Sequence, residues 1–337
     1  MDRFSLGYNT YSIRALRWND LQLIEYANSL KLDAIFLQDS IDPGANDPAH
    51  WKAVKDAAAR AGLWLGTGGG AVLPNAAGEL DRSVKLLSDS IQRAAGMGSP
   101  LVRTLLAGDR DHLPPGPPAK HVETMIKVLR AVRSQAVDAG VKFAIENHKE
   151  LLCWETRQVI DGAGKEFVGS YLDTGNPVFV MEDPMQAVET LGPVAVMLHL
   201  RDSVVYESRG GIAVQWVPLG EGVVDFQALL AKAREICPPL AVFIKPITGR
   251  PPGDSAGLER GVHAEVRRPA RRGLRAIPGA GQERRPLRAP HGHRGRARKS
   301  RRAPHRRSRL PAARAHGARR GVRQESPRPR HPLARLR

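Results

Sequence analysis

Eight short apolar runs, separated by helical stretches, constrain the fold of this chain more than any other feature. Each run is continuous rather than alternating in apolar residues, which is typical of strands in a parallel sheet that is covered on its faces. The runs begin near residues 5, 34, 63, 101, 141, 168, 194 and 240. Most steps are about 27–40 residues, the size of one strand–helix unit. The pattern therefore predicts an α/β fold in which strands and helices alternate.

The limits of the eight expected strands follow from these runs. They are Leu6–Ile13, Ala34–Gln38, Leu63–Thr67, Leu101–Leu106, Val141–Glu146, Val168–Asp173, Val194–Leu200 and Leu240–Ile244. The longer interval before the last strand contains Val204–Val217. We expect this segment to form a hairpin-like excursion after strand seven.

Seven helical segments are expected between the strands. Two of them carry apolar stripes at helical spacing, Val84, Leu87, Ile91 and Ala94, and Val122, Met125, Leu129, Val132 and Ala136. Asn19 and Asp225 stand at expected N-caps, and Gly62, Gly96 and Gly140 follow expected helices. Eight strands with seven intervening helical segments predict a (β/α)8 TIM barrel rather than an open doubly wound sheet.

Charge divides the chain into two parts. The whole chain carries 52 Lys+Arg and 34 Asp+Glu, a net charge of +18. Residues 255–337 hold 26 of the basic and 4 of the acidic residues, a net of +22, which leaves residues 1–254 with a net of −4. The basic character therefore belongs to the last quarter, and it does not make the whole protein a nucleic-acid or membrane binder. We predict a barrel over residues 1–254, close to the usual length of that fold.

Residues 255–337 are expected to form a disordered, low-complexity tail, because Arg, Pro, Ala, Gly and His without aromatic residues cannot build a core. Two explanations compete. The tail is a basic arm that binds nucleic acid through phosphates, or it is GC-rich DNA translated out of frame. The lack of stacking aromatic residues favours the frameshift. A frameshift also explains why the helix expected after the eighth strand is missing from the sequence.

Other classes of protein are excluded more simply. No apolar stretch approaches the roughly 18–20 residues of a membrane span, and no secretory signal is visible at Met1–Tyr8. Cys153 and Cys237 stand alone, which fits buried thiols in a reducing compartment. We therefore expect a cytoplasmic protein. His50 has no metal-ligating partner at helical spacing.

Three polar residues stand in register at the ends of consecutive expected strands. Glu146, Asp173 and His199 end strands five, six and seven and are 27 and 26 residues apart, one strand–helix unit each time. The C-terminal ends of barrel strands are where such folds build their sites. Two carboxylates and an imidazole suit a divalent metal such as Mn²⁺, Mg²⁺, Co²⁺ or Zn²⁺. We expect the three side chains to converge.

Four short motifs in the same order carry a resemblance. They are Glu146-Asn147-His148, Leu172-Asp173-Thr174-Gly175-Asn176, His199-Leu200-Arg201-Asp202, and Pro218 to Phe226. Over about residues 5–252 the chain resembles the sugar phosphate isomerase/epimerase family, which are xylose-isomerase-like TIM barrels. The resemblance implies that Glu146, Asp173 and His199 are metal ligands. It also implies that His148, Asn176 and Asp202 line the substrate pocket.

One position departs from the family pattern. The fourth ligand is commonly a glutamate on strand eight that also serves as an acid/base, and the matching residue here is Lys245. An ammonium group repels a divalent ion. Three interpretations follow: three ligands and water hold the metal, Lys245 replaces the metal's charge in a metal-free site, or Lys245 itself carries protons.

The reaction that the resemblance implies is a metal-dependent isomerisation or epimerisation of a sugar, sugar phosphate or related polyhydroxy carbonyl compound. A carboxylate removes a proton from the carbon beside the carbonyl and returns it elsewhere. Glu146 is the expected base, and Lys245 is its expected partner. Arg103, at the end of strand four, is expected either to hold the substrate or to form a salt bridge with a neighbouring strand-end carboxylate.

Two alternatives use the same barrel. One is a dehydratase of a cyclitol or shikimate-like compound, which also begins with removal of an acidic C–H proton. The other is a non-catalytic ligand-binding barrel in which Lys245 abolishes metal binding. In all three cases the expected partner is a small carbohydrate-like molecule; nucleic acid is a partner only if the basic tail is genuine.

Overall fold

The computed structural model describes residues 4–38, 42, 45–71, 80–110, 113–208, 211–247 and 253–254. Contacts divide the chain into two units, Met1–Gln282 and Glu283–Arg337, and every described residue lies in the first. The tail predicted for residues 255–337, and the place after strand eight where a closing helix is expected to be missing, lie outside the described residues. The boundary at residue 254 stays a prediction.

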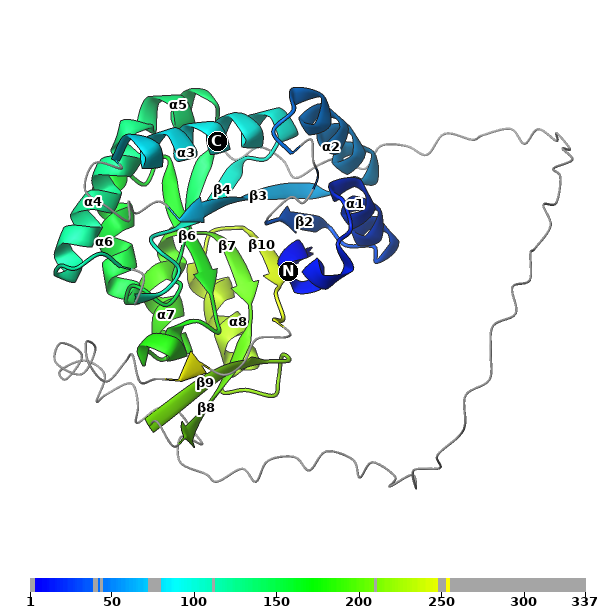
Figure 1. Cartoon of the computed structure of the whole chain (residues 1–337). Helices are drawn as coiled ribbons and strands as arrows, with labels where there is room; N and C mark the ends of the chain where they lie inside the picture. Colours follow the sequence, from blue (N-terminus) through cyan, green and yellow to red (C-terminus); the bar gives the residue numbers. More distant parts are fainter. Residues whose placement is uncertain are drawn as a thin grey trace, which may run out of the picture. The chain divides into compact units, whose positions relative to one another are not determined.

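Eight parallel strands close into a barrel, which confirms the predicted TIM-barrel fold (Figure 1). The strands are β1 (Ser5–Asn9), β2 (Ala34–Leu37), β3 (Trp64–Ala71), β4 (Leu101–Leu105), β5 (Lys142–Glu146), β6 (Val168–Asp173), β7 (Ala195–Leu200) and β10 (Ala241–Ile244). Their order around the barrel is β1-β10-β7-β6-β5-β4-β3-β2. The first and last strands close the barrel, with Ser5 opposite Ala241.

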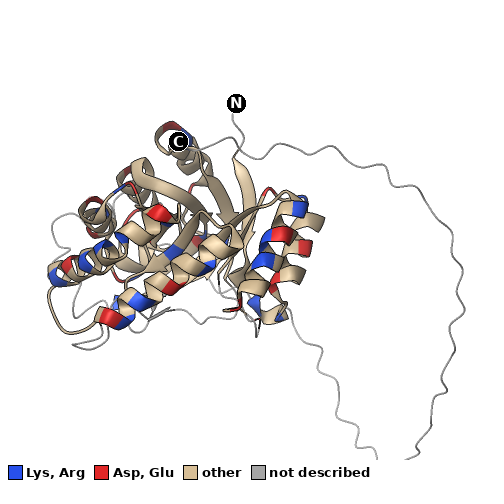
Figure 2. Ribbon diagram, turned by 90° about the horizontal axis from the view of Figure 1, so that it is seen from above, with Lys and Arg blue, Asp and Glu red and all other residues tan. Residues whose placement is uncertain are grey.

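Helices connect consecutive strands and cover the outside of the barrel (Figure 1). They are α1 (Asp20–Ser29), α2 (Pro48–Ala61), α3 (Leu80–Met97), α4 (Pro118–Ala131), α5 (Arg133–Asp138), α6 (Cys153–Ala163), α7 (Pro184–Leu191) and α8 (Phe226–Ile236). Short 3-10 helices add η1 (Thr10–Leu16), η3 (Pro177–Val180) and η4 (Gly192–Val194). Figure 2 shows basic and acidic residues interspersed along the outer helices. None of the described helices is long and apolar enough to cross a membrane.

The caps that the sequence predicts for α1 and α8 are present. The Asn19 side chain accepts a hydrogen bond from the Gln22 amide and the Asp225 side chain accepts one from the Ala228 amide. Gly62 ends α2 with a left-handed backbone, φ 67°. Gly96 does not end its helix as predicted, because α3 continues to Met97.

Gly96 has a packing role instead of a capping role. A Cβ atom at this position would lie 2.6 Å from the indole of Trp51 on α2, so glycine lets α2 and α3 approach each other. Gly98, with φ 74°, is the residue that turns the chain after α3. The sequence prediction was two residues early.

β1 is shorter than the predicted Leu6–Ile13 strand. The side chain of Asn9 accepts a hydrogen bond from the amide of Tyr11, which starts η1 at Thr10. A side chain that satisfies its own backbone two residues later competes with strand pairing. The chain therefore leaves the barrel wall at Asn9 and places η1 at the C-terminal end of the strands.

The core has two layers. Inside the barrel, apolar side chains of alternate strand positions pack together: Ala34, Phe36, Leu101, Ala144, Tyr171, Met197, Ala241 and Phe243. Between barrel and helices, the predicted helix stripes are buried, with Leu87, Ile91, Met125 and Leu129 at most 1% exposed. Because the lower part of the barrel is filled, polar side chains gather at the C-terminal ends of the strands.

The predicted excursion after strand seven is an antiparallel hairpin of β8 (Asp202–Ser208) and β9 (Gly211–Val217), with Asp202 opposite Val217. The short strand β11 (Gly253–Asp254) pairs with the other edge of β9. In Figure 1 the hairpin projects below the barrel, beside the ends of β7 and β10. A single residue, Arg201, separates β7 from the hairpin, so the hairpin lies beside the residues at the end of that strand.

Candidate functional site

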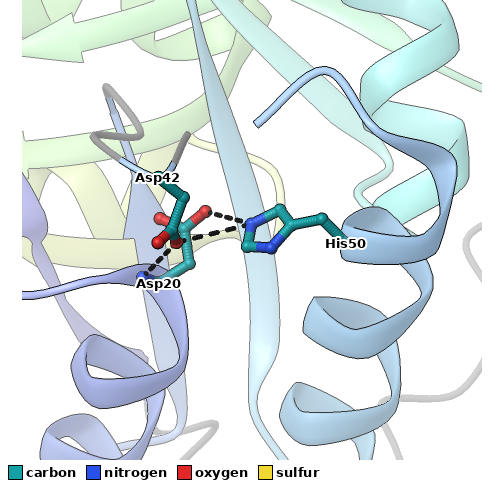
Figure 3. Close-up of side chains that lie close together, drawn as sticks. All are labelled: Asp20, Asp42 and His50. Atoms are coloured by element: carbon teal, nitrogen blue, oxygen red, sulfur yellow. Dashed lines mark hydrogen bonds and ion pairs between the residues drawn. The ribbon is translucent and has the colours of Figure 1, made fainter. Parts of the chain in front are cut away.

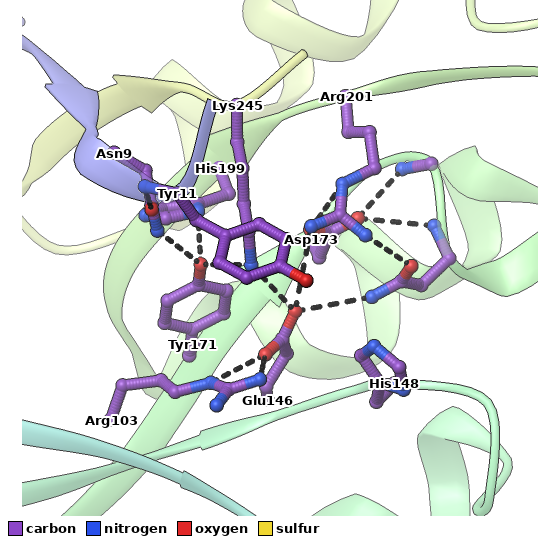
Figure 4. A network of polar contacts seen from close by, with 12 residues as sticks. Asn9, Tyr11, Arg103, Glu146, His148, Tyr171, Asp173, His199, Arg201 and Lys245 are labelled. Carbon is purple, nitrogen blue, oxygen red and sulfur yellow. Dashed lines mark hydrogen bonds and ion pairs between the residues drawn. The ribbon is translucent and has the colours of Figure 1, made fainter. Parts of the chain in front are cut away.

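The residues predicted to converge do meet at the C-terminal end of the barrel (Figure 4). Glu146 and Asp173 are the last residues of β5 and β6, and His199 lies in β7. Strand register places Asp173 opposite His199 and Glu146 opposite Tyr171. All four side chains are at most 2% exposed. The site is therefore built by neighbouring strands and shielded from water.

Glu146 is held by cations on both of its oxygens. Arg103 donates to Oε2 through Nε, at 2.6 Å, and through Nη2. Oε1 accepts from Nζ of Lys245 at 3.3 Å and from Nδ2 of Asn176 at 3.2 Å. Burial opposes ionisation, but Arg103 and Lys245 outweigh it and hold the pKa of Glu146 well below its usual range. Glu146 is thus a carboxylate at neutral pH.

Arg103 therefore forms a salt bridge with a neighbouring strand-end carboxylate, which is one of the two roles that the sequence predicts for it. It binds Glu146 across β4 and β5, and its Nη1 also donates to the Gly69 carbonyl at 3.4 Å. Both Arg103 and Glu146 are buried. A role of Arg103 in holding substrate stays a prediction.

The two carboxylate oxygens of Asp173 have different partners: backbone amides lie beside one, and the Arg201 side chain lies beside the other. Oδ1 accepts from the amides of Gly175 and Asn176 at 3.0 and 3.1 Å, which folds the loop after β6 back onto the strand end. Oδ2 lies 3.3 Å from Nε of Arg201 but has no hydrogen-bond partner among the described residues. Burial raises the pKa of Asp173, although Arg201 works against this shift.

Lys245 follows β10 directly and points its ammonium group into the cluster. Its backbone amide donates to the Leu200 carbonyl at 3.1 Å, which extends the register between β10 and β7 by one residue. Nζ reaches Glu146 and the hydroxyl of Tyr171, the latter at 3.1 Å. Burial lowers the pKa of Lys245 to about 7, with Glu146 opposing the shift.

His199 is buried as a neutral imidazole. Its Nδ1 shares a hydrogen bond with the Tyr171 hydroxyl, and its ring packs against Phe36 and Phe243. Burial and the charge of Lys245 hold the pKa of His199 well below its usual range. Nε2 has no hydrogen-bond partner among the described residues. One nitrogen is therefore left for a ligand.

Three members of the network were not singled out from the sequence. Arg201 lies at the end of β7, Tyr171 in β6 and Asn9 at the end of β1. Arg201 donates to Asn176 Oδ1 at 2.8 Å, and Asn9 donates to the Tyr171 hydroxyl at 3.4 Å. A signal existed for two of them. Tyr171 and Arg201 are each two positions from a predicted ligand, and residues two apart in a strand share a face.

The other predicted pocket residues have different surroundings. Asn176 is in the network, between Glu146 and Arg201. His148 points toward Glu150, with 3.6 Å between Nδ1 and Oε2, and its side chain is 15% exposed. Asp202 is fully buried, and its carboxylate accepts from four backbone amides, those of Ser203, Gly220, Gly222 and Val224. Asp202 shapes the turn before α8, and pocket roles for these three residues stay predictions.

The spacing of the predicted metal ligands and the charges around them do not suit a divalent ion. Among the described residues, the ligand atoms of Glu146, Asp173 and His199 do not all lie within 4.8 Å of one another. Lys245 lies beside Oε1 of Glu146 and Arg201 lies beside Oδ2 of Asp173, and both oxygens would have to face an ion. Arg103 binds the other oxygen of Glu146, Oε2. Three cations against two carboxylates do not fit a divalent metal.

A different group does have metal-site spacing. Nε2 of His50 lies 2.9 Å from Oδ2 of Asp20 and 3.5 Å from Oδ2 of Asp42, and the three ligand atoms are within 4.8 Å of one another (Figure 3). The sequence offers His50 no metal-ligating partner at helical spacing, and the partners in the structure are distant in the chain. Its partners come from the start of α1 and the loop after β2, and helical spacing does not test such distant positions.

The fold is that of a known family. The model of the xylose isomerase-like TIM barrel family matches residues 24–237, and the chain belongs to this family. This confirms the family inferred from the strand-end motifs. The match covers the strands that carry Glu146, Asp173 and His199, but it ends before Lys245.

Two curated relatives match over a shorter stretch. The uncharacterized protein YihM of Escherichia coli is 28% identical over 99 residues, which is 29% of this chain and 30% of that protein. The 3-oxo-isoapionate decarboxylase of Pectobacterium atrosepticum is 26% identical over 106 residues, 31% of this chain and 38% of that protein. The chain thus aligns with about a third of the length of these relatives.

Solved structures resemble the barrel over most of their length. The IolI protein with a bound zinc atom has a TM-score of 0.60 at 14% identity, covering 72% of this chain and 88% of that one. D-psicose 3-epimerase with D-fructose has 0.59 at 18% identity, covering 75% and 88%. AsbF of Bacillus anthracis, a probable 3-DHS dehydratase, has 0.58 at 11% identity, covering 73% and 93%. At these identities the likeness shows the fold alone.

Proposed function

We propose that the chain is an isomerase or epimerase of a sugar, sugar phosphate or related polyhydroxy carbonyl compound. The observation that carries the proposal is the buried carboxylate of Glu146, ionised at the end of β5 and flanked by the cations Arg103 and Lys245. An ionised carboxylate can accept a proton, and a neighbouring cation is suited to stabilising the negative charge that forms on the substrate. Arg103 and Lys245 lower the pKa of Glu146 and so weaken it as a base in the absence of substrate.

In the proposed reaction, Glu146 removes the proton from the carbon beside the substrate carbonyl. The electron pair moves to the carbonyl oxygen, and the developing negative charge is stabilised by the ammonium group of Lys245, which lies beside Glu146. In an isomerase, Glu146 returns the proton to the former carbonyl carbon, and the hydroxyl proton of the first carbon passes to the former carbonyl oxygen. In an epimerase, Lys245, the expected partner of Glu146, protonates the other face of the same carbon. A substrate beside Oε1 displaces the contact with Lys245, which makes Glu146 a stronger base.

The family supports this reaction class. D-psicose 3-epimerase, one of the structures with this fold, is named for an epimerisation of a keto sugar. The metal-dependent form expected from the sequence places a divalent ion among Glu146, Asp173 and His199. The charges of Lys245 and Arg201 favour stabilisation by side chains instead.

A dehydratase is the second candidate, and the fold that the chain shares with the probable dehydratase AsbF favours it. Removal of a cyclitol or shikimate-type C–H proton by Glu146 is the same first step, followed by loss of a hydroxyl group. The non-catalytic alternative predicts binding without any proton transfer. The three candidates therefore differ in their products rather than in the residues they use.

Deuterium exchange tests the shared step. The protein is incubated in D₂O with D-fructose, D-tagatose, L-sorbose, 5-keto-D-gluconate and 3-dehydroshikimate, and proton NMR follows each signal beside the carbonyl. Exchange with an isomeric product supports the isomerase or epimerase, and loss of water supports the dehydratase. We expect Glu146→Gln to slow exchange at least 100-fold, the usual contribution of a general base. Full exchange by that variant, or none by the wild type, contradicts the proposal.

A further inference from the structure

We propose that Lys245 and Arg201 take the place of a divalent ion, and that Arg201 in this metal-free centre binds the carboxylate of a sugar acid directly. The inference rests on the proposed function for the carbonyl chemistry, and it names the class of substrate. It also predicts that the centre discriminates a sugar acid from the uncharged sugar of the same shape.

The first argument is the balance of charge. Arg103, Arg201 and Lys245 contact two carboxylates, Glu146 and Asp173, and all five side chains are at most 7% exposed. The set therefore carries one more positive than negative charge when every member is ionised. Burial disfavours this excess charge and lowers the pKa of Lys245 to about 7, whereas an anionic ligand would stabilise the fully ionised set.

The second argument is the incomplete hydrogen bonding of Arg201. Its Nη1 donates to Asn176, and its buried Nε lies 3.3 Å from Asp173 Oδ2 without forming a hydrogen bond among the described residues. The planar fork of a guanidinium group matches the two oxygens of a carboxylate better than any other side chain. His199 Nε2 is a second polar atom in the same network without a hydrogen-bond partner among these residues.

Arg201 is held in place from two sides. The guanidinium carbon lies 4.8 Å from the centre of the Trp216 ring, which comes from β9 of the hairpin. On the other side, a Cβ at Gly175 would lie 2.8 Å from Cγ of Arg201, so glycine leaves the room that the arginine occupies. An arginine fixed in this way loses little freedom when it binds a ligand.

The third argument is that Lys245 and Arg201 already contact the carboxylate oxygens that a divalent ion would bind. Nζ of Lys245 is 3.3 Å from Glu146 Oε1, and Nε of Arg201 is 3.3 Å from Asp173 Oδ2. Nδ1 of His199 is already bonded to Tyr171. A divalent ion between these groups would lie close to two positive charges.

A matched pair of ligands tests the carboxylate. 5-Keto-D-gluconate and L-sorbose have the same ketone and the same hydroxyl arrangement, and they differ in one terminal carboxylate. Calorimetric titration of the full chain should show at least tenfold tighter binding of the keto acid, and Arg201→Met should abolish the preference. Arg133→Met is the control, because Arg133 is 55% exposed and pairs only with Glu166 among the ion pairs resolved here. Equal affinity of the wild type for both ligands overturns the proposal.

Titration with Mn²⁺ tests whether the centre around Glu146 and Asp173 binds a divalent metal. It is done with His50→Ala, so that the Asp20, Asp42 and His50 group does not contribute. We expect no stoichiometric Mn²⁺ binding by this variant, and one Mn²⁺ per chain after Lys245→Glu is added. Binding of one Mn²⁺ by His50→Ala that Glu146→Gln removes overturns the metal-free centre, whether or not the double variant folds.

These tests are independent of the deuterium exchange. A preference for the keto acid without any exchange supports the inference about the ligand and refutes the proposed reaction. Exchange with L-sorbose and no preference for the carboxylate does the reverse.

Discussion

The carboxylate of Asp202 accepts a hydrogen bond from the amide of Gly222, 20 residues further along the chain, at 2.8 Å. The same carboxylate accepts from the amides of Ser203, Gly220 and Val224, so it ties the start of β8 to the turn before α8. We predict that Asp202→Ala lowers the free energy of unfolding by about 2–4 kcal/mol, because several buried amides lose their acceptor. Thermal and urea unfolding measure it.

Asp202→Asn removes the negative charge of this side chain but keeps its shape, so it shows how much of the stability depends on the charge. Its amide keeps one acceptor oxygen but turns a donor toward backbone N–H groups, so we expect a smaller loss than for alanine. A loss for Asp202→Ala below about 0.5 kcal/mol, the size of an ordinary surface change, would show that the turn does not depend on this carboxylate.

Phe243 fills the inside of the barrel, where it contacts Phe36, Trp64 and His199. We predict that Phe243→Ala costs about 3–5 kcal/mol, because the closed barrel cannot collapse around the cavity. Trp154→Ala is the matched control, since Trp154 is 48% exposed and should cost far less. Similar losses for the two variants, measured by urea unfolding, would contradict the prediction.

Arg103 lowers the pKa of Glu146, so its removal should raise that pKa. In the pH profile of deuterium exchange, we expect the acidic limb of Arg103→Met to lie at higher pH than in the wild type. The variant should also lose about 3–5 kcal/mol of stability, because a buried charge loses its partner. Arg133→Met, which breaks an exposed pair with Glu166, should leave the acidic limb unchanged and cost at most about 1 kcal/mol.

Glu182 gives the folded protein a dependence on pH. Loss of hydration raises its pKa to about 7, although the Cys153 amide donates to both of its oxygens. A carboxyl whose pKa is raised by folding stabilises the fold below its ordinary value of 4.5, and this contribution disappears as the pH rises through about 7.

Glu182→Gln tests this dependence. We expect wild-type stability to fall by about 1–3 kcal/mol more between pH 4.5 and 7.5 than that of the variant. Unfolding in urea at several pH values measures it. Parallel curves for the two proteins would show that Glu182 does not titrate differently in the folded and unfolded states.

The barrel followed from the sequence because its signals are local. Continuous apolar runs define strands, and the interval between them defines the crossover helices. Errors arose where one side chain overrides the pattern, as where Asn9 ends β1 early, or where packing decides, as at Gly96 against Trp51.

The site was only partly predictable. Glu146, Asp173 and His199 were found from their spacing, because equivalent places on neighbouring strands are one repeat apart. Arg201 and Tyr171 share strand faces with predicted ligands, but nothing in the sequence shows which cation reaches which carboxylate. The Asp20, Asp42 and His50 group depends on two loops that come together only in the folded chain.

The pairing of β1 with β10 has a consequence for how the protein is made. Ser5 lies opposite Ala241, so one edge of the first strand waits for its partner until nearly all of the barrel has been synthesised. An open strand edge is a template for pairing with other chains.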